Sequence, residues 1–230
     1  LGGARGHPGQ IFLNTGGGKF APFEANALAA HADSEDAGAL FFDADADGDL
    51  DLYVASGGVE DDAGHLNYRD RLYLNEGKGI LSDATKDVLP EARLSSGPVA
   101  AADFDRDGDL DIIANTLYGP FKVYTNNNTQ GNSVTIKLVD EQGNRFCLGC
   151  TIIICYGPDG TLHQMREIKT GGGFHSYDAP VAHFGLGEYE TIYQIEITWS
   201  TGETSILKHN FPANHEYTTR RRASTALPVK

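Results

Sequence analysis

The stretch that decides the fold is Asp43-Ala-Asp-Ala-Asp-Gly-Asp-Leu-Asp51, which recurs 60 residues later as Asp103-Phe-Asp-Arg-Asp-Gly-Asp-Leu-Asp111. After the first copy the chain alternates, so that Leu50, Leu52 and Val54 would share one face of an extended strand. The second copy is followed by a similar apolar segment. A strand that follows a repeated acidic loop predicts a repeated β-sheet unit.

A second element repeats with nearly the same period. Ile11-Phe-Leu-Asn-Thr-Gly-Gly-Gly-Lys-Phe20 matches Leu72-Tyr-Leu-Asn-Glu-Gly-Lys-Gly-Ile80, and a weaker copy is Val123-Tyr-Thr-Asn126. Each copy predicts a strand followed by a turn. Strand-turn-strand units that recur at this spacing indicate propeller blades or a β-solenoid. The segments 27–32 and 83–93 are expected to form short helical turns or loops.

The acidic loops have the composition of calcium sites. Five carboxylates within nine residues repel one another unless a cation lies among them. Ca²⁺ takes six to eight oxygen ligands, and carboxylates at alternate positions converge when glycines such as Gly48 and Gly108 let the chain curl. The first loop is predicted to bind one Ca²⁺ through the side chains of Asp43, Asp45, Asp47 and Asp51 and the backbone carbonyl of Asp49. The second loop is predicted to bind another through Asp103, Asp105, Asp107, Asp111 and the carbonyl of Asp109.

These segments have three alternative interpretations. An EF-hand loop needs Glu at position 12, where this sequence has Val54 and Ala114. Gly16-Gly-Gly-Lys19 lacks the leading glycine of a phosphate loop, and Phe20 stands where Ser or Thr would bind Mg²⁺, so a hairpin turn is expected. An acidic, solvated turn without metal is the remaining alternative for each loop.

The acidic loops resemble those of the FG-GAP/VCBS repeat family, which follow the pattern Asp-x-Asp-x-Asp-Gly-x-x-Asp. Arg71-Leu-Tyr-Leu-Asn-Glu-Gly-Lys-Gly79 is also similar to the strand and turn between that family's loops. The resemblance covers roughly residues 8–128 and implies Ca²⁺ bound between strands of β-propeller blades. It implies a propeller of about seven blades, of which this chain holds about two. The open strand edges are then expected to be covered by a longer parent chain or by neighbouring chains, or to belong to a solenoid-like pair.

A second set of strands follows a wholly polar linker, Thr125-Asn-Asn-Asn-Thr-Gln-Gly-Asn132, which includes a glycosylation sequon at Asn127. Alternation and turn residues predict an antiparallel β-sandwich with strands at 134–139, 151–156, 164–168, 192–199 and 204–207.

This region resembles the ASPIC/UnbV domain over about residues 131–218. The resemblance rests on five motifs in order: Asn144-Arg-Phe-Cys-Leu-Gly149, Arg166-Glu167, Gly171-Gly-Gly-Phe-His-Ser-Tyr-Asp178, His183-Phe-Gly-Leu-Gly187 and Ile195-Glu-Ile-Thr-Trp-Ser-Thr-Gly202. It implies a secreted, matrix or cell-surface protein and supplies no established catalytic residue. Ser200, where the family usually has Pro, and the three cysteines depart from its pattern.

The expected architecture is therefore all-β, with a partial β-propeller followed by a β-sandwich. Residues 1–130 are assigned to the calcium-binding repeats, 131–219 to the sandwich, and 220–230 to a basic tail outside both cores.

Charge and cysteine content limit the partners. The chain has 32 acidic and 18 basic residues and a net charge of −14, so nucleic acid and anionic membranes are poor partners. The sequence has no apolar run of about 20 residues that would span a membrane. Cys147, Cys150 and Cys155 are expected to be buried thiols or to form one local disulfide; a zinc site with His163 is the alternative.

These features predict an extracellular calcium-binding module for adhesion or assembly, with protein or glycan partners and no catalytic activity. One alternative is a self-assembling homo-oligomer or filament that pairs through open strand edges. The other is a fragment of a calcium-dependent secreted enzyme, for which His175, Tyr177, Asp178 and His183 are the residues nearest to an acid-base cluster.

Overall fold

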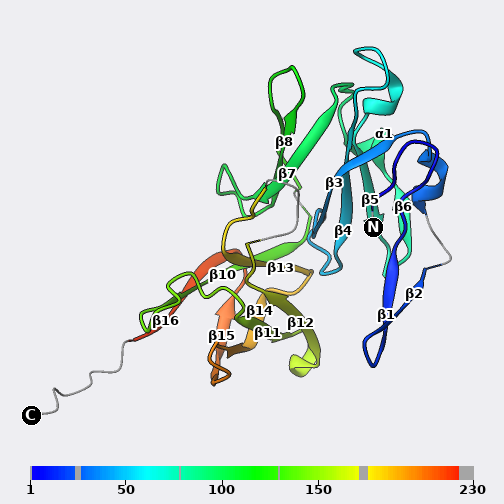
Figure 1. The fold of residues 1–230 in the computed structure, drawn as a ribbon. Coiled ribbons are helices and arrows are strands. Elements are labelled where there is room, and N and C mark those ends of the chain that lie inside the picture. Colours follow the sequence, from blue (N-terminus) through cyan, green and yellow to red (C-terminus); the bar gives the residue numbers. More distant parts are fainter. Residues whose placement is uncertain (1, 24–26, 78, 129, 171–175, 223–230) are drawn as a thin grey trace, which may run out of the picture.

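The computed structural model describes residues 2–23, 27–77, 79–128, 130–170 and 176–222 and is built mainly from β-strands (Figure 1). The first half contains β1 (Phe12–Gly16), β2 (Lys19–Pro22), β3 (Glu35–Phe42), β4 (Asp51–Gly57), β5 (Arg71–Asn75), β6 (Leu81–Asp83), β7 (Ser96–Ala102), β8 (Asp111–Thr116) and β9 (Lys122–Tyr124). The second half contains β10 (Asn132–Asp140), β11 (Thr151–Tyr156), β12 (Leu162–Glu167), β13 (Val181–Gly187), β14 (Thr191–Thr198), β15 (Thr204–Pro212) and β16 (His215–Arg221). The helical elements are η1 (Ala27–His31), η2 (Leu66–Tyr68), α1 (Thr85–Val88) and η3 (Pro158–Gly160). The predicted all-β class is confirmed.

The repeats form blade-like antiparallel sheets. One sheet has the order β3-β4-β5-β6 and the next has the order β7-β8-β9, while β1 and β2 form a separate hairpin (Figure 1). We call the first two sheets blade 1 and blade 2. Strands β3 and β7 lie side by side, and a hydrophobic layer drawn from both sheets fills the space between them.

The predicted alternation in β4 is confirmed, but both of its faces are buried. Leu52 and Val54 pack with the N-terminal segment around Leu28, whereas Tyr53 faces blade 2. Ile112 is the blade 2 equivalent of Leu52, and it packs against blade 1. Each unit therefore turns the same face toward the preceding one, as stacked blades do.

A buried polar cluster joins the blades. The Oδ2 atom of Asp70 accepts hydrogen bonds from Lys122 Nζ at 2.7 Å, Tyr53 OH at 2.7 Å and Ser96 Oγ at 3.0 Å. Lys122 and Asp70 are almost fully buried and come from different blades. Because a buried charge that loses its partner is strongly destabilising, this pair fixes blade 2 against blade 1.

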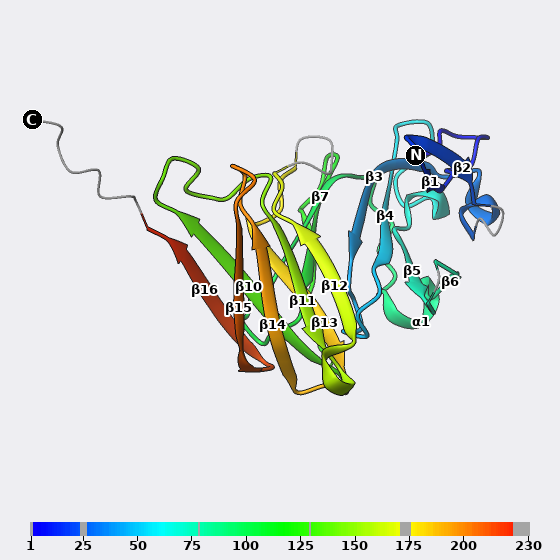
Figure 2. The same ribbon diagram turned by 90° about the horizontal axis from the view of Figure 1, so that it is seen from below.

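The second domain is a sandwich of the sheets β13-β10-β16 and β12-β11-β14-β15, with one apolar core between them (Figure 2). The predicted antiparallel sandwich is confirmed, and the structure adds one parallel pair, between β10 and β16, to its antiparallel strand pairs. The short connection at Ala213 and Asn214 carries the chain from β15 in one sheet to β16 in the other. A connection between sheets leaves β16 free to run parallel to β10.

The expected boundary of the basic tail is corrected. Strand β16 runs through Arg221, whose guanidinium forms ion pairs with Asp140 at 3.2 Å and with Glu203, and lies 5.7 Å from the centre of the Trp199 ring. Arg220 belongs to the same strand. The charge run contains the end of a strand in which Arg221 pairs with neighbouring acids. Residues 223–230 lie outside the described part of the chain.

The three cysteines are free and buried within the described structure. Cys147 and Cys150 belong to the sandwich core near the start of β11, whereas Cys155 lies near its end, with its Sγ 3.1 Å from His163 Nδ1. The alternative zinc set of Cys147, Cys150 and His163 is therefore not assembled. In the ranges that the structure covers, no helix has the length and apolar character needed to cross a membrane.

Candidate metal centre

The two acidic loops connect the first two strands of each blade and share one backbone conformation. Ala46 and Gly48 have φ values of 61° and 103°, and Arg106 and Gly108 have values of 65° and 105°. Positive φ is accessible to glycine at little cost but is strained for other residues. The same unusual backbone geometry in both loops curls each loop so that its carboxylates converge.

The last acid of each loop, Asp51 or Asp111, stabilises the loop conformation by accepting two backbone hydrogen bonds. Asp51 Oδ2 accepts the N–H of Ala44 at 2.6 Å, and its Oδ1 accepts the N–H of Asn75 at 2.7 Å. Asp111 accepts the two equivalent N–H groups, both at 2.8 Å. Asn75 ends β5, the strand of the second repeated element, so these hydrogen bonds explain why the two sequence repeats occur together.

The middle acids orient one another through the backbone. Asp45 Oδ1 accepts the N–H of Asp47 at 3.3 Å, and Asp47 Oδ1 accepts the N–H of Asp49 at 2.8 Å. The corresponding distances in the second loop are 3.2 Å and 3.0 Å. Each carboxylate keeps acceptor capacity that these single contacts do not use.

One oxygen at the start of each loop is buried without a partner. Asp43 Oδ1 and Asp103 Oδ1 have no hydrogen-bond partner in the described structure. Asp43 as a whole is only 2% exposed. Because buried polar atoms are nearly always satisfied, an orphaned carboxylate oxygen in each loop fits a hard cation such as Ca²⁺.

The structure brings most of the predicted ligands together. Carboxylate oxygens lie within 4.8 Å of one another in two groups, Asp43 with Asp45 and Asp47, and Asp103 with Asp105 and Asp111. The other predicted side-chain ligands, Asp51 and Asp107, belong to the same curled loops and take part in their hydrogen bonds. Asp49 and Asp109 were predicted to contribute backbone carbonyls, and they follow the glycine that reverses the chain.

Electrostatics disfavour Asp43, Asp51 and Asp109 as bare anions. Burial, followed by repulsion from Asp51 and the other loop acids, raises the pKa of Asp43 from 3.8 to about 7, against a lowering effect of Arg166. Burial is also the largest cause that raises the pKa of Asp51 and of Asp109, each to about 6. A divalent cation would reverse this tendency by favouring the charged forms.

The sandwich covers the first loop, which the sequence did not predict. The N–H of Gly185 in β13 donates to Asp43 Oδ2 at 3.0 Å, and the N–H of Gly187 donates to the carbonyl of Ala46 at 2.7 Å. The motif His183-Phe-Gly-Leu-Gly187 contained a sequence signal for this contact, because glycines in a strand can mark close approach of another backbone.

The sandwich contacts the second loop at the carbonyl of Gly108. Gly108 O accepts hydrogen bonds from Ser133 Oγ at 2.7 Å and from His183 Nε2 at 2.8 Å. Burial lowers the pKa of His183, which favours the neutral ring. His183 is thus a hydrogen-bonded structural residue at the domain boundary.

The other residues of the possible acid-base cluster have separate contacts. Asp178 Oδ1 accepts the N–H of Ala101 in β7 at 3.1 Å, and Tyr177 is 73% exposed. His175 lies outside the described residues. Asp178 therefore links the sandwich to blade 2 rather than facing His183 as an acid-base partner.

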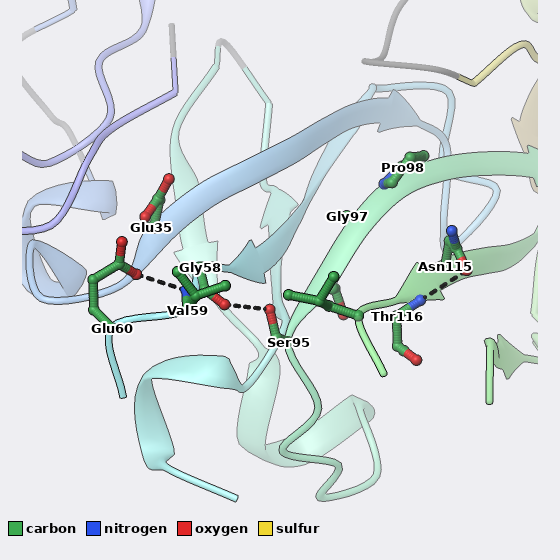
Figure 3. Close-up of a pocket in the computed structure, with 11 residues that line it drawn as sticks. Glu35, Gly58, Val59, Glu60, Ser95, Gly97, Pro98, Asn115 and Thr116 are labelled. Atoms are coloured by element: carbon green, nitrogen blue, oxygen red, sulfur yellow. Dashed lines mark hydrogen bonds between the residues drawn. The ribbon is translucent and has the colours of Figure 1, made fainter. Parts of the chain in front are cut away.

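A cavity of about 360 Å³ lies between the blades at the strand ends opposite the acidic loops (Figure 3). Its lining includes Glu35 and Glu60, and the side chain of Glu60 accepts the N–H of Val59 at 2.8 Å. Ser95 Oγ donates to the carbonyl of Gly58 at 2.8 Å. These side-chain contacts go to backbone groups, and we assign no reaction to the cavity.

Comparisons with known proteins identify two domains in the expected order. Residues 63–114 match the family described as FG-GAP-like repeat, and residues 140–226 match the family described as ASPIC and UnbV. The chain is similar to cartilage acidic protein 1 from Homo sapiens and from Mus musculus, each 32% identical over 117 residues, and from Xenopus tropicalis, 30% identical over 117 residues. Each match covers 50% of this chain and 17% of the relative. The first loop precedes the matched repeat, yet it has the hydrogen bonds of the second.

Proposed function

Because the chain carries an FG-GAP-like repeat followed by an ASPIC and UnbV domain, we propose that it is an extracellular interaction module whose blades are stabilised by two calcium ions. The first ion would be held by Asp43, Asp45, Asp47, Asp51 and the carbonyl of Asp49. The second ion would be held by Asp103, Asp105, Asp107, Asp111 and the carbonyl of Asp109. Each ion supplies two positive charges to a loop of mutually repelling carboxylates, so its role is structural rather than catalytic.

The observation that carries this proposal is the pair of orphaned oxygens, Asp43 Oδ1 and Asp103 Oδ1, at equivalent positions of two loops with the same fold. A solvated acidic turn would present its carboxylates to water. Here the first carboxylate of each loop has an oxygen withdrawn from solvent, and other acids face it. That arrangement is favourable when a cation completes it.

The net negative charge disfavours nucleic acid and anionic membranes as partners. The net charge is −14, and two bound Ca²⁺ ions would leave it at about −10. Such a surface favours protein or glycan partners that carry basic groups or bound cations. The similarity to proteins named cartilage acidic protein 1 supports an extracellular location, where free calcium is high enough for sites with dissociation constants of about 0.1–1 mM.

The proposal is tested by melting temperature with and without calcium. Asp47→Ala and Asp107→Ala each remove one exposed acid, and each should lower the melting temperature in calcium. A site with a dissociation constant of about 0.1 mM contributes roughly 1.4 kcal/mol at about 1 mM calcium. The double variant should respond little to a chelator, whereas the control Glu141→Ala, an exposed acid of the sandwich, should respond like the wild type. If chelation leaves the wild-type melting temperature unchanged and instead abolishes turnover of a substrate, the enzyme alternative replaces this proposal.

A self-assembling subunit is the second candidate function, favoured by the hairpin β1–β2. This two-stranded sheet exposes Phe12, Leu13 and Phe20, the last of them 64% accessible. An exposed apolar hairpin can pair with a strand of another chain. Sedimentation velocity should show concentration-dependent association that Phe20→Ser weakens; a monomer at every concentration would exclude this candidate.

A further inference from the structure

The two acidic loops differ in how far the second domain covers them. Asp43 in the first loop is 2% exposed, whereas Asp103 is half-buried and Asp105 is exposed. The cover over the first loop comes from β13 and from Gln164 in β12, which lies close to Gly48. The first loop is therefore part of the domain boundary itself.

Asp43 is shared between the two domains. Its Oδ2 accepts one N–H from its own loop, that of Gly48 at 3.1 Å, and one from β13, that of Gly185 at 3.0 Å. Its Oδ1 is buried without a partner in the described structure. One oxygen thus lies in the contact between domains, and the other is left for an ion.

The two backbones meet too closely to admit a side chain. A Cβ atom at Gly185 would lie 2.1 Å from Asp43 Oδ2 and 2.6 Å from the carbonyl carbon of Ala46. The N–H of Gly187 donates to Ala46 O at 2.7 Å, and Gln164 Nε2 donates to Gly185 O at 2.5 Å. A change in the backbone conformation of the loop around Ala46 would therefore displace or break its contacts with β13.

We propose that the calcium ion of the first loop is an interdomain joint, in which Gly185 is the positioning residue that fixes Asp43. This inference rests on the proposed function, because it requires the first loop to bind calcium. An ion at Asp43 Oδ1 holds the carboxylate with its Oδ2 toward the N–H of Gly185. Without the ion, repulsion among the loop acids acts against that position.

The coupling is reciprocal. If calcium favours docking of the sandwich on the blades by some factor, docking raises the calcium affinity of the first loop by the same factor. Among the described residues, the hydrogen bonds between the second loop and the sandwich go to the carbonyl of Gly108 and not to a ligand side chain. Its calcium affinity should therefore depend much less on docking.

The test uses the full chain, with hydrogen exchange of the segment 181–187 measured with and without calcium, and calcium affinity measured by calorimetric titration. In the wild type, calcium should slow exchange in this segment about tenfold. Gly185→Ala should remove that slowing and weaken one of the two sites about tenfold, leaving the other unchanged. Gly97→Ala is the matched control, because a Cβ atom there would meet nothing within 4 Å.

The near-ultraviolet signal of Trp199, in the sandwich core, reports whether each variant is folded. If Gly185→Ala fails to fold, Gln164→Ala replaces it, since that change removes the amide between Gly185 O and the loop without adding volume. Calcium binding at two sites with no change of exchange in 181–187, or with both affinities intact in the folded variant, would overturn the joint and leave the proposed function standing. Absence of calcium binding in the wild type would overturn both.

Discussion

Replacing Asp43 with Asn should stabilise the chain without calcium, and calcium should cancel or reverse that gain. The pKa of Asp43 rises from 3.8 to about 7 in the folded chain, which corresponds to roughly 4 kcal/mol against the charged form near neutral pH. An amide keeps an acceptor for the N–H groups of Gly48 and Gly185 and removes the charge. Its new NH₂ group, if left unpaired, costs about 1–3 kcal/mol. Without metal, Asp43→Asn should therefore stabilise the chain by about 1–3 kcal/mol.

With calcium this gain should be cancelled or reversed, because the ion loses a charged ligand. At about 10 mM calcium and a dissociation constant of about 0.1 mM, an intact site contributes roughly 2.7 kcal/mol, and Asp43→Asn should lose most of it. Scanning calorimetry in chelator and in calcium measures both arms, with Glu141→Gln as the control for removal of an exposed charge. Equal destabilisation by Asp43→Asn in both conditions would refute the reasoning, since Asp43 would then act only through its hydrogen bonds.

Three further outcomes are expected. Without metal, the unfolding free energy should fall as pH rises from about 4 to about 7, because the raised pKa values of Asp43 and Asp109 make the folded state hold protons that the unfolded chain has lost. Calcium should remove most of this pH dependence. Denaturant titrations without metal that show stability rising with pH would contradict the prediction. Lys122→Met leaves Asp70 buried without its cation and should lower the unfolding free energy by about 3–5 kcal/mol with or without calcium; a loss under about 1 kcal/mol would show that the pair does not join the blades. Arg221→Ala should lower stability by about 1–3 kcal/mol through loss of its ion pairs and ring contact, and an unchanged midpoint in urea would restore the earlier boundary of the basic tail.

The parts of the fold that the sequence predicted depend on residue patterns within short segments. The alternating Asp residues specify a curl around a cation, and the period-two pattern after Asp51 specifies a strand. The repeat of Leu72–Asn75 at a matching period predicted β5. The backbone N–H of Asn75 donates to Asp51 Oδ1, and this hydrogen bond explains why the two repeated elements occur together.

The parts that sequence missed depend on contacts between distant segments. Strand β13 contains Gly185 and Gly187, and glycine lowers strand propensity. The structure explains these glycines, because the backbone of the first loop lies close against them. Strand β16 ends in a charge run that resembles a tail in the sequence, and the ion pair between Arg221 and Asp140 is apparent only in the structure. Burial of both faces of β4 likewise follows from stacking with neighbouring units, which alternation within one strand does not reveal.

The central claim, one calcium ion in each loop, is tested most directly by counting bound calcium. Equilibrium dialysis at millimolar free calcium should find two ions per chain for the wild type. Asp45→Ala and Asp105→Ala, which each remove one member of a carboxylate cluster, should each leave one ion. A count of zero for the wild type, or a count of two that neither substitution lowers, would contradict the account.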